Sequence, residues 1–441
     1  MNTLSGAAHV DPLVRSASVR GACPSIAAPM QTGDGLLVRL IVHEPIDIEK
    51  LCTLCSAAEE HGNGIIEITQ RGSLQIRGLR EASASSFARV IASLDIGAGE
   101  SPPLVTSPLL GLDPDEPFDS TALASSLRTT LQQERENLES LGPKVSVLID
   151  GGGQLHLDAV SADIRLVATS KPLFQLSLAG NARSATHLGY VPTERATAAV
   201  GELLRRIASQ GPTARAKDLT LGQQIDDLRR SFSDSLIDGP APGRSDFADR
   251  APFFQQPPNP RPPAETVGVY RLANGTVARG FALPFGHTTA GALRRFTRAA
   301  ADNGASSIRP APGRSLLAIG LSQTAADTLC RAAVEEDFVV DAQDLRRHVV
   351  ACAGAPACAS AELPTRQLAP EVARVIRSWA GTSNIVHLSG CSKGCAHPGP
   401  AALTLTGPDR LILNGRASDT PQATISAAGP IADIERLCSE L

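Results

Sequence analysis

The chain has 441 residues, of which 42% are hydrophobic and 20% are charged, and this length predicts two to four globular domains. A net charge of −4 and an aromatic content of 3% argue against the basic field and the stacking surfaces that nucleic-acid-binding proteins use. Residues 1–20 carry no apolar signal core, no run reaches the ~18 apolar residues of a membrane span, and nine cysteines are an odd number. We therefore expect a cytoplasmic protein without a nucleic-acid or membrane partner.

The first structured region shows a β-α-β-β pattern. Residues 34–42 predict a strand, and residues 46–61 predict an amphipathic helix that ends before Gly62. Residues 65–71 and 74–78 predict two further strands. This segment, residues 20–95, is the predicted half-domain A.

The same pattern returns in residues 266–340, the predicted half-domain A′. A strand-like segment at 274–283 precedes a helical segment at 289–303, which Gly304 ends, and strands at 306–310 and 315–321. A two-copy repeat of this size predicts two half-domains related by a pseudo-two-fold axis and sharing one sheet.

A fainter repeat links residues 144–152 to residues 384–391, since each reads as a strand followed by a glycine turn. Strand pairs are expected after each copy, near 155–166 and 401–413. The chain order is therefore A, B, A′, B′, with domain B at 100–237 and domain B′ at 341–441. A proline-rich linker at 238–265 separates B from A′ and is too rich in proline to lie inside a sheet.

Four cysteines of domain B′ fall into two tight pairs, Cys352 with Cys358 and Cys391 with Cys395. Both pairs lie in turns of small residues, which let the backbone approach an inorganic group closely. Four thiolates saturate a [4Fe–4S] cluster, which is the predicted ligand. Disulfides would need an oxidising compartment, zinc sites usually use C-x2-C pairs, and unliganded buried cysteines usually occur singly.

These cysteine pairs, downstream of two repeated halves, resemble the sulfite and nitrite reductase superfamily, as do residues 69–71 and 75–77. Within it, residues 20–26, 29–39, 150–158 and 162–165 resemble the precorrin-3B synthase family. The resemblance runs from about residue 20 to the end of the chain. It implies an α+β fold of two ferredoxin-like half-domains paired as a pseudo-two-fold, plus two α+β domains of the cluster-binding type.

The resemblance also implies a reaction. It is the O2-dependent hydroxylation of precorrin-3A at C20 with lactone formation, in aerobic cobalamin biosynthesis. The implied cofactors are a [4Fe–4S] cluster, a mononuclear non-haem iron and NADH as reductant. No G-x-G-x-x-G motif follows a strand, so we expect electrons to arrive from a separate reductase or a ferredoxin. In the superfamily the last cysteine, here Cys395, bridges the cluster to sirohaem, and Arg71 faces the tetrapyrrole.

Two departures weigh against a sirohaem-dependent assimilatory sulfite or nitrite reductase, the alternative reading. Residues 102–108 lack the second arginine of those enzymes, and only Lys144 remains of their Lys-x-Lys pair. Reduction of a small anion needs strong cationic stabilisation, which these losses weaken. A non-catalytic iron–sulfur carrier is a third reading, which the doubled architecture disfavours.

Arginine binds carboxylates with two hydrogen bonds, and the implied substrate carries many carboxylates. Motif matches therefore mark Arg71 and Lys144 as catalytic and substrate-binding residues. Position in the A repeats adds Arg77, Arg309 and Arg314 as substrate-binding candidates. The alternative for each is a solvated surface charge.

The ligands of the implied mononuclear iron are open. His287, His387 and His397 are candidates, but no 2-His-1-carboxylate spacing stands out, and Cys395 is a further candidate as a bridge to the iron. Cys52 and Cys55 form a C-x2-C on the inner face of a helix and are expected in the core. The remaining cysteines have no partner by spacing and are expected to be structural: Cys23, Cys330 and Cys438.

Overall fold

The computed structural model describes residues 24–97, 102–170, 172–232, 261–376, 384–425 and 430–440. The described residues fall into two compact units: one holds those between 99 and 265 together with 270–276, and the other holds the rest. Residues 238–260 of the predicted linker lie outside the described residues, as do Cys23 and the side chain of Cys438.

Half-domain A has the predicted β-α-β-β order, followed by a second helix. Its first helix buries Leu51, Leu54 and Ala58, the stripe that its 3.6-residue period predicts, and ends before Gly62. The elements are β1 (Met30–Thr32), β2 (Gly35–Leu40), β3 (Ile46–Asp47), α1 (Ile48–His61), β4 (Ile65–Ile68), β5 (Leu74–Leu79) and α2 (Ala84–Leu94).

Half-domain A′ repeats this order. Its first helix begins after Thr289, whose side-chain oxygen accepts a hydrogen bond from the backbone N–H of Ala292. The elements are β11 (Val269–Arg271), β12 (Val277–Ala282), β13 (His287–Thr289), α6 (Ala290–Asp302), β14 (Ser307–Ala311), β15 (Ser315–Leu321) and α7 (Gln323–Glu335).

The two half-domains exchange one short strand each. In half A, β3 leaves its own sheet and pairs with β14 of half A′, with Ile46 opposite Ile308. In return β13 pairs with β4, with Thr288 opposite Ile66. This reciprocal exchange expresses the pseudo-two-fold relation. The expectation of one shared sheet was wrong: there are two sheets, with orders that include β2-β5-β4-β13 and β12-β15-β14-β3.

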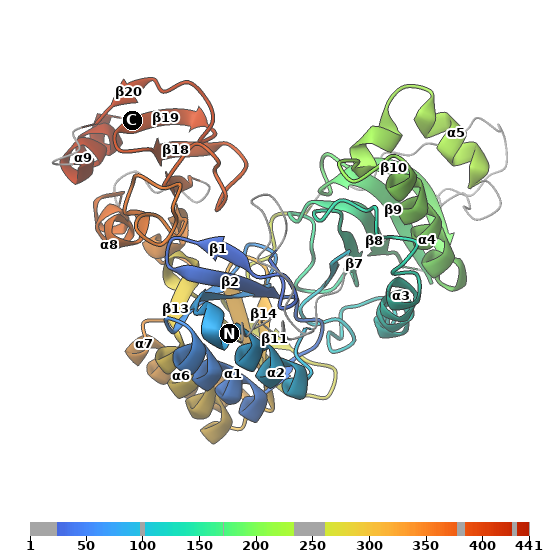
Figure 1. The fold of residues 1–441 in the computed structure, drawn as a ribbon. Helices are drawn as coiled ribbons and strands as arrows, with labels where there is room; N and C mark the ends of the chain where they lie inside the picture. Colours follow the sequence, from blue (N-terminus) through green and yellow to red (C-terminus); the bar gives the residue numbers. More distant parts are fainter. Residues whose placement is uncertain are drawn as a thin grey trace, which may run out of the picture. The chain divides into compact units, whose positions relative to one another are not determined.

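Helices α1, α2, α6 and α7 lie side by side against these sheets (Figure 1). Apolar side chains of both halves merge there into one core. Phe296 of α6 packs on Phe281 and Phe338, with ring centroids 5.0 Å and 4.7 Å apart. These three rings all belong to half-domain A′, and the two halves are joined by the packing of α1 on α6 within the common core.

Domain B′ belongs to the same unit and carries the four cysteines. Its sheet has the order β16-β17-β18-β19-β20, in which the first two pairs are parallel and the last two antiparallel. The elements are β16 (Val349–Ala351), α8 (Thr365–Val375), β17 (Val386–Ser389), β18 (Ala401–Thr406), β19 (Arg410–Gly415), β20 (Ala423–Thr424) and α9 (Pro430–Glu440).

Domain B forms the other unit and repeats this topology, with order β6-β7-β8-β9-β10 and the same sequence of parallel and antiparallel pairs. The strand pair expected near 155–166 begins later, because the segment after β7 buries Leu155 and Leu157 in a turn. The elements are β6 (Leu104–Thr106), α3 (Thr121–Gln133), β7 (Val147–Asp150), β8 (Ala162–Ala168), β9 (Leu173–Gly180), β10 (Thr186–Pro192), α4 (Thr193–Ser209) and α5 (Gln224–Ser231).

Candidate functional site

The two cysteine pairs follow the adjacent parallel strands β16 and β17. Because carboxyl ends of parallel strands meet at one edge of a sheet, the two loops lie together. The backbone N–H of Cys352 donates to the carbonyl of Leu388 at 3.2 Å. The N–H of Gly390 donates to the sulfur of Cys352 at 3.1 Å, which places the start of the second loop on a thiol of the first.

Glycine is required where these loops touch. A Cβ on Gly390 would lie 2.4 Å from the Cβ of Ala361. Gly354 has a φ of +66°, and a Cβ there would lie 2.4 Å from the hydroxyl oxygen of Thr365. That hydroxyl donates to the carbonyl of Cys352 at 2.7 Å and so fixes the loop at the start of α8.

The four thiols are close enough to influence one another electrostatically. Burial raises the pKa of Cys395, and the neighbouring Cys391, Cys352 and Cys358 raise it further. None of the seven cysteines that the structure describes is in a disulfide. A bound cationic centre deprotonates its own thiol ligands and so offsets the cost of bringing several thiolates together. The donor set fits an iron–sulfur cluster.

Arg77 connects half-domain A to the first cysteine loop. It is 4% exposed, forms two 3.0 Å hydrogen bonds with the carboxylate of Asp34, and donates to the carbonyl of Ala357 at 2.9 Å. Burial lowers its pKa, but Glu67 and Asp34 outweigh this, so the pKa is raised. The N–H of Gly33 also donates to the Ala357 carbonyl. These contacts occupy the guanidinium that was predicted to bind substrate.

Arg314 makes the corresponding connection from half-domain A′ to the second loop. Its guanidinium donates to the carbonyl of Ala396, next to Cys395, and to the side chain of Gln70, both at 2.6 Å. Burial lowers its pKa to about 10. The residue therefore links the turn after β14 with both the Gln70 turn and the cysteine loop.

The other predicted substrate residues lie in different settings. Arg71 is exposed in the turn between β4 and β5, next to Gln70, and Arg309 is 5% exposed within β14. Lys144 is exposed before β7 in the other unit. The sequence analysis missed Arg366, which pairs with Glu67 close to Arg77. Its position directly after the first cysteine loop, at the start of α8, was the available signal.

Sequence and structure comparisons bear on identity. Residues 28–94 match the nitrite/sulfite reductase ferredoxin-like half domain. A precorrin-3B synthase from Sinorhizobium sp is 37% identical over 425 residues, which is 95% of this chain and 88% of the relative. The chain belongs to the precorrin-3B synthase family.

Two more distant relatives place this synthase family within the reductase superfamily. A ferredoxin–nitrite reductase from Synechococcus elongatus is 24% identical over 392 residues, 81% of this chain and 73% of the relative. The structure of the Mycobacterium tuberculosis NirA protein superposes with a TM-score of 0.71 at 20% identity, covering 92% of this chain and 80% of that one. The fold is thus that of the sulfite and nitrite reductases, and the superfamily implies iron–sulfur cluster binding.

Precorrin-3B synthases act on a tetrapyrrole, and this chain shares that substrate class through its family. No helix within the described ranges is long and apolar enough to cross a membrane.

Cys52 and Cys55 lie on the buried face of α1, 8% and 0% exposed, as predicted for core residues. Burial raises the pKa of both thiols, as expected for cysteines packed in an apolar core.

Among the described residues, none of the three histidines considered for iron lies in a group of three clustered metal-binding side chains. Burial lowers the pKa of His287 to about 4, helped by Arg366, and lowers that of His387 to about 3, helped by His397. Both ring nitrogens of His387 are buried and unbonded among the described residues. Among the described residues, three clustered metal-binding side chains lie in domain B instead: Asp150, His156 and Asp158. The sequence analysis used segment 150–158 for the family resemblance but did not identify these residues as metal ligands.

Proposed function

We propose that the chain catalyses the O2-dependent hydroxylation of precorrin-3A at C20, with lactone formation, in the aerobic route to cobalamin. The carrying observation is the 37% identity to a precorrin-3B synthase over 95% of the chain. It is supported by four cysteines that converge on one loop pair in a reductase-like fold. The enzyme is therefore a monooxygenase, for which a cytoplasmic location suits a thiolate-bound cluster.

Cys352, Cys358, Cys391 and Cys395 would hold a [4Fe–4S] cluster. When bound, that cluster supplies single electrons for oxygen activation, and a mononuclear non-haem iron is the second proposed metal. NADH is the proposed ultimate reductant, acting through a separate reductase or ferredoxin. Arg77 and Arg314 hold the two cysteine loops against the half-domains through the carbonyls of Ala357 and Ala396.

Substrate carboxylates are the proposed partners of Arg71 and Lys144, because both residues are exposed and both carry the superfamily motif match. Arg309 and Arg314 are weaker candidates for this role, since Arg309 is buried in a strand and Arg314 already donates to two oxygen atoms. Arg77 is weaker for the same reason as Arg314.

The test is a single-turnover assay of the anaerobically purified full-length chain. Precorrin-3A, a ferredoxin and its NADH-dependent reductase are supplied, and the product is weighed by mass spectrometry after exposure to isotopically labelled O2. We expect one labelled oxygen atom in the product, loss of product in Cys395→Ser, and retained product in Cys330→Ser. Cys330 is the matched control because it lies on α7 and bonds only its own helix.

The alternative, a sirohaem-dependent reductase, has the 24% identical nitrite reductase in its favour. It predicts a strong Soret-type band at near-stoichiometric haem content and consumption of nitrite or sulfite. Those results, together with no oxygen transfer to precorrin-3A, would overturn the proposal.

A further inference from the structure

Domains B and B′ can be matched residue by residue through their strand pairing. Leu104 pairs with Val147 in domain B, as Val349 pairs with Val386 in domain B′. Val147 in turn pairs with Ile164, as Val386 pairs with Leu403, so the loops after β7 and β17 have equal length. The match therefore runs without a gap through the segment that holds Cys391 and Cys395, whereas the segment between the first two strands is longer in domain B than in domain B′.

Domain B places other residues at three of the four ligand positions. Ser107 corresponds to Cys352, three residues after the paired Leu104 and Val349. Gly152 corresponds to Cys391, and His156 to Cys395, five and nine residues after Val147 and Val386. The loop keeps its geometry, because the N–H of Gly151 donates to the oxygen of Ser107 at 2.9 Å, as Gly390 does to Cys352.

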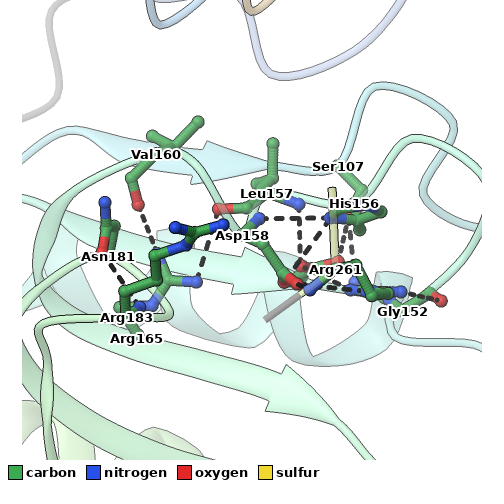
Figure 2. A network of polar contacts seen from close by, with 12 residues as sticks. Ser107, Gly152, His156, Leu157, Asp158, Val160, Arg165, Asn181, Arg183 and Arg261 are labelled. Atoms are coloured by element: carbon green, nitrogen blue, oxygen red, sulfur yellow. Dashed lines mark hydrogen bonds and ion pairs between the residues drawn. The ribbon is translucent and has the colours of Figure 1, made fainter. Parts of the chain in front are cut away.

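At this place the structure gathers three potential metal ligands. One ligand atom each from Asp150, His156 and Asp158 lies within 4.8 Å of the others, and the histidine and Asp158 side chains are only 9% and 10% exposed. Figure 2 shows His156 and Asp158 converging with Arg261 beside the Gly152 turn. Imidazole and carboxylate groups together suit a first-row divalent metal such as iron(II).

Hydrogen bonds from neighbouring groups fix the orientation of the Asp150 carboxylate, as they do for metal ligands in natural sites. Its Oδ1 accepts hydrogen bonds from Ser107 and the N–H of Gly152, and its Oδ2 accepts one from the N–H of Leu157. A carboxylate oxygen has two lone pairs, so Oδ2 keeps one for a further partner. Such orientation by surrounding groups is what raises metal affinity at natural sites.

That remaining direction is taken by Arg261 in this structure. Its Nη2 lies 3.1 Å from Asp158 Oδ1 and 3.6 Å from Asp150 Oδ2, so a positive group already bridges the two carboxylates. The side chain of Arg261 is 38% exposed and has a path to solvent. A metal ion and this guanidinium would therefore compete for the same oxygen atoms.

The local charge balance favours a second cation. Burial raises the pKa of Glu116 to about 7, with Asp113 and Asp150 adding to the rise, and its Oε1 is buried without a partner among the described residues. Around this turn, three carboxylates face two guanidinium groups, Asp113, Asp150 and Asp158 against Arg165 and Arg261, and Glu116 adds a partial negative charge at neutral pH.

We propose that Asp150, His156 and Asp158 bind one iron(II) ion, in the loop of domain B that corresponds to the Cys391–Cys395 loop of domain B′, with His156 at the place of Cys395. Binding of the ion rests on this geometry alone. Its use in oxygen activation rests on the proposed function. Arg261 neutralises the empty carboxylates and leaves when the ion binds.

The test measures iron and acid-labile sulfide in the full-length protein, purified anaerobically with its cluster and incubated with iron(II). We expect about one iron in excess of sulfide for the wild type. Asp158→Asn and His156→Ala should lose that iron while sulfide and the cluster spectrum stay unchanged. Arg261→Gln should keep it and bind iron(II) roughly tenfold more tightly, since a competitor of the size of a charged hydrogen bond is removed.

Asp163→Asn is the matched control, because Asp163 is a buried carboxylate of the same domain that bonds Arg215 and lies outside the three-residue group. It should keep the excess iron. If Asp158→Asn does not fold, His156→Ala is the deciding variant, since the histidine ring makes only long contacts with Asp158 among the described residues: 3.4 Å from its backbone N–H and 3.5 Å from its Oδ1.

The proposal is overturned if the wild type holds no iron beyond its sulfide, or if His156→Ala keeps the excess. Product formed from precorrin-3A without excess iron would reject this site and leave the proposed function standing. Excess iron that depends on His156, with no oxygen transfer to precorrin-3A, would support this site and reject the proposed function.

Discussion

Ser107 and Cys352 occupy the same position in the two copies of a repeated domain, and each accepts a hydrogen bond from the backbone N–H of a glycine in the neighbouring loop. The two loops therefore share this contact although the acceptor is oxygen in one copy and sulfur in the other. In domain B the hydroxyl also donates to Asp150 Oδ1 at 3.2 Å. One position therefore anchors a cysteine site in one copy and a carboxylate site in the other.

Ser107→Ala should destabilise domain B by about 2 kcal/mol, because it leaves the buried N–H of Gly151 without an acceptor. Ser107→Cys should cost less, since sulfur accepts the equivalent bond at Cys352. Urea unfolding followed by circular dichroism measures both. Ser126→Ala on α3, whose hydroxyl makes an exposed bond to Thr197, is the control and should change stability by less than ~0.5 kcal/mol. Equal effects at the two serines would contradict the assigned role.

Asp34→Asn should destabilise the unit that contains the cysteines by about 3 kcal/mol, because it removes one partner of a largely buried ion pair with Arg77. Arg77 also holds Ala357 in the first cysteine loop, so the variant should lose its cluster faster to an iron chelator. The bleaching rate of the visible absorbance measures this. Glu134→Gln, which breaks the exposed pair with Arg205, should cost under ~1 kcal/mol and leave the bleaching rate unchanged. An unchanged bleaching rate in Asp34→Asn would show that the ion pair with Arg77 does not help to hold the cysteine loop.

Long periodic elements were predictable from the sequence. The helical stripe of α1 and the strands β12 and β15 follow from spacing alone, and the repeat of A in A′ is confirmed by their common strand order. The exchange of β3 and β13 could not be predicted, because strands of two and three residues show no periodicity. Their pairing is decided by the packing of two half-domains.

The metal-binding candidates were only partly within reach of the sequence. Spacing identified the four cysteines. Arg77 and Arg366 instead act through buried contacts with residues that are hundreds of positions away in the sequence, and spacing does not reveal such contacts. Asp150, His156 and Asp158 could have been found by extending the repeat of 144–152 and 384–391 a few residues further, which sets His156 opposite Cys395. Without the strand register that extension had no support.

Stability should fall between pH 7 and pH 5 through His287. Burial lowers its pKa to about 4 in the folded state, against the usual 6.5, so in this window the unfolded chain binds a proton that the folded chain does not. Acidification therefore favours unfolding, by about 2 kcal/mol at pH 5 relative to pH 7. In His287→Gln the fall between the two pH values, measured by urea unfolding, should be smaller than in the wild type by that amount, while the part caused by His387 remains. Between pH 7 and pH 8.5 the two proteins should show parallel curves, and a variant as pH-sensitive as wild type would contradict the prediction.

Arg71 and Arg314 should respond differently to substitution because one is exposed and the other holds two oxygen atoms. Arg71→Gln should raise KM for precorrin-3A roughly tenfold or more, the value of one charged hydrogen bond to a substrate carboxylate, with little change in kcat or in the cluster spectrum. Arg314→Lys replaces two nitrogen atoms, one for Gln70 and one for Ala396, by a single one, so it should weaken the contact with the cysteine loop and shift the paramagnetic resonance signal of the reduced cluster. Arg230→Gln on the surface helix α5 should change neither quantity. If Arg314→Lys raised KM and left the resonance signal unaltered, Arg314 would be a substrate-binding residue and not a support of the cysteine loop.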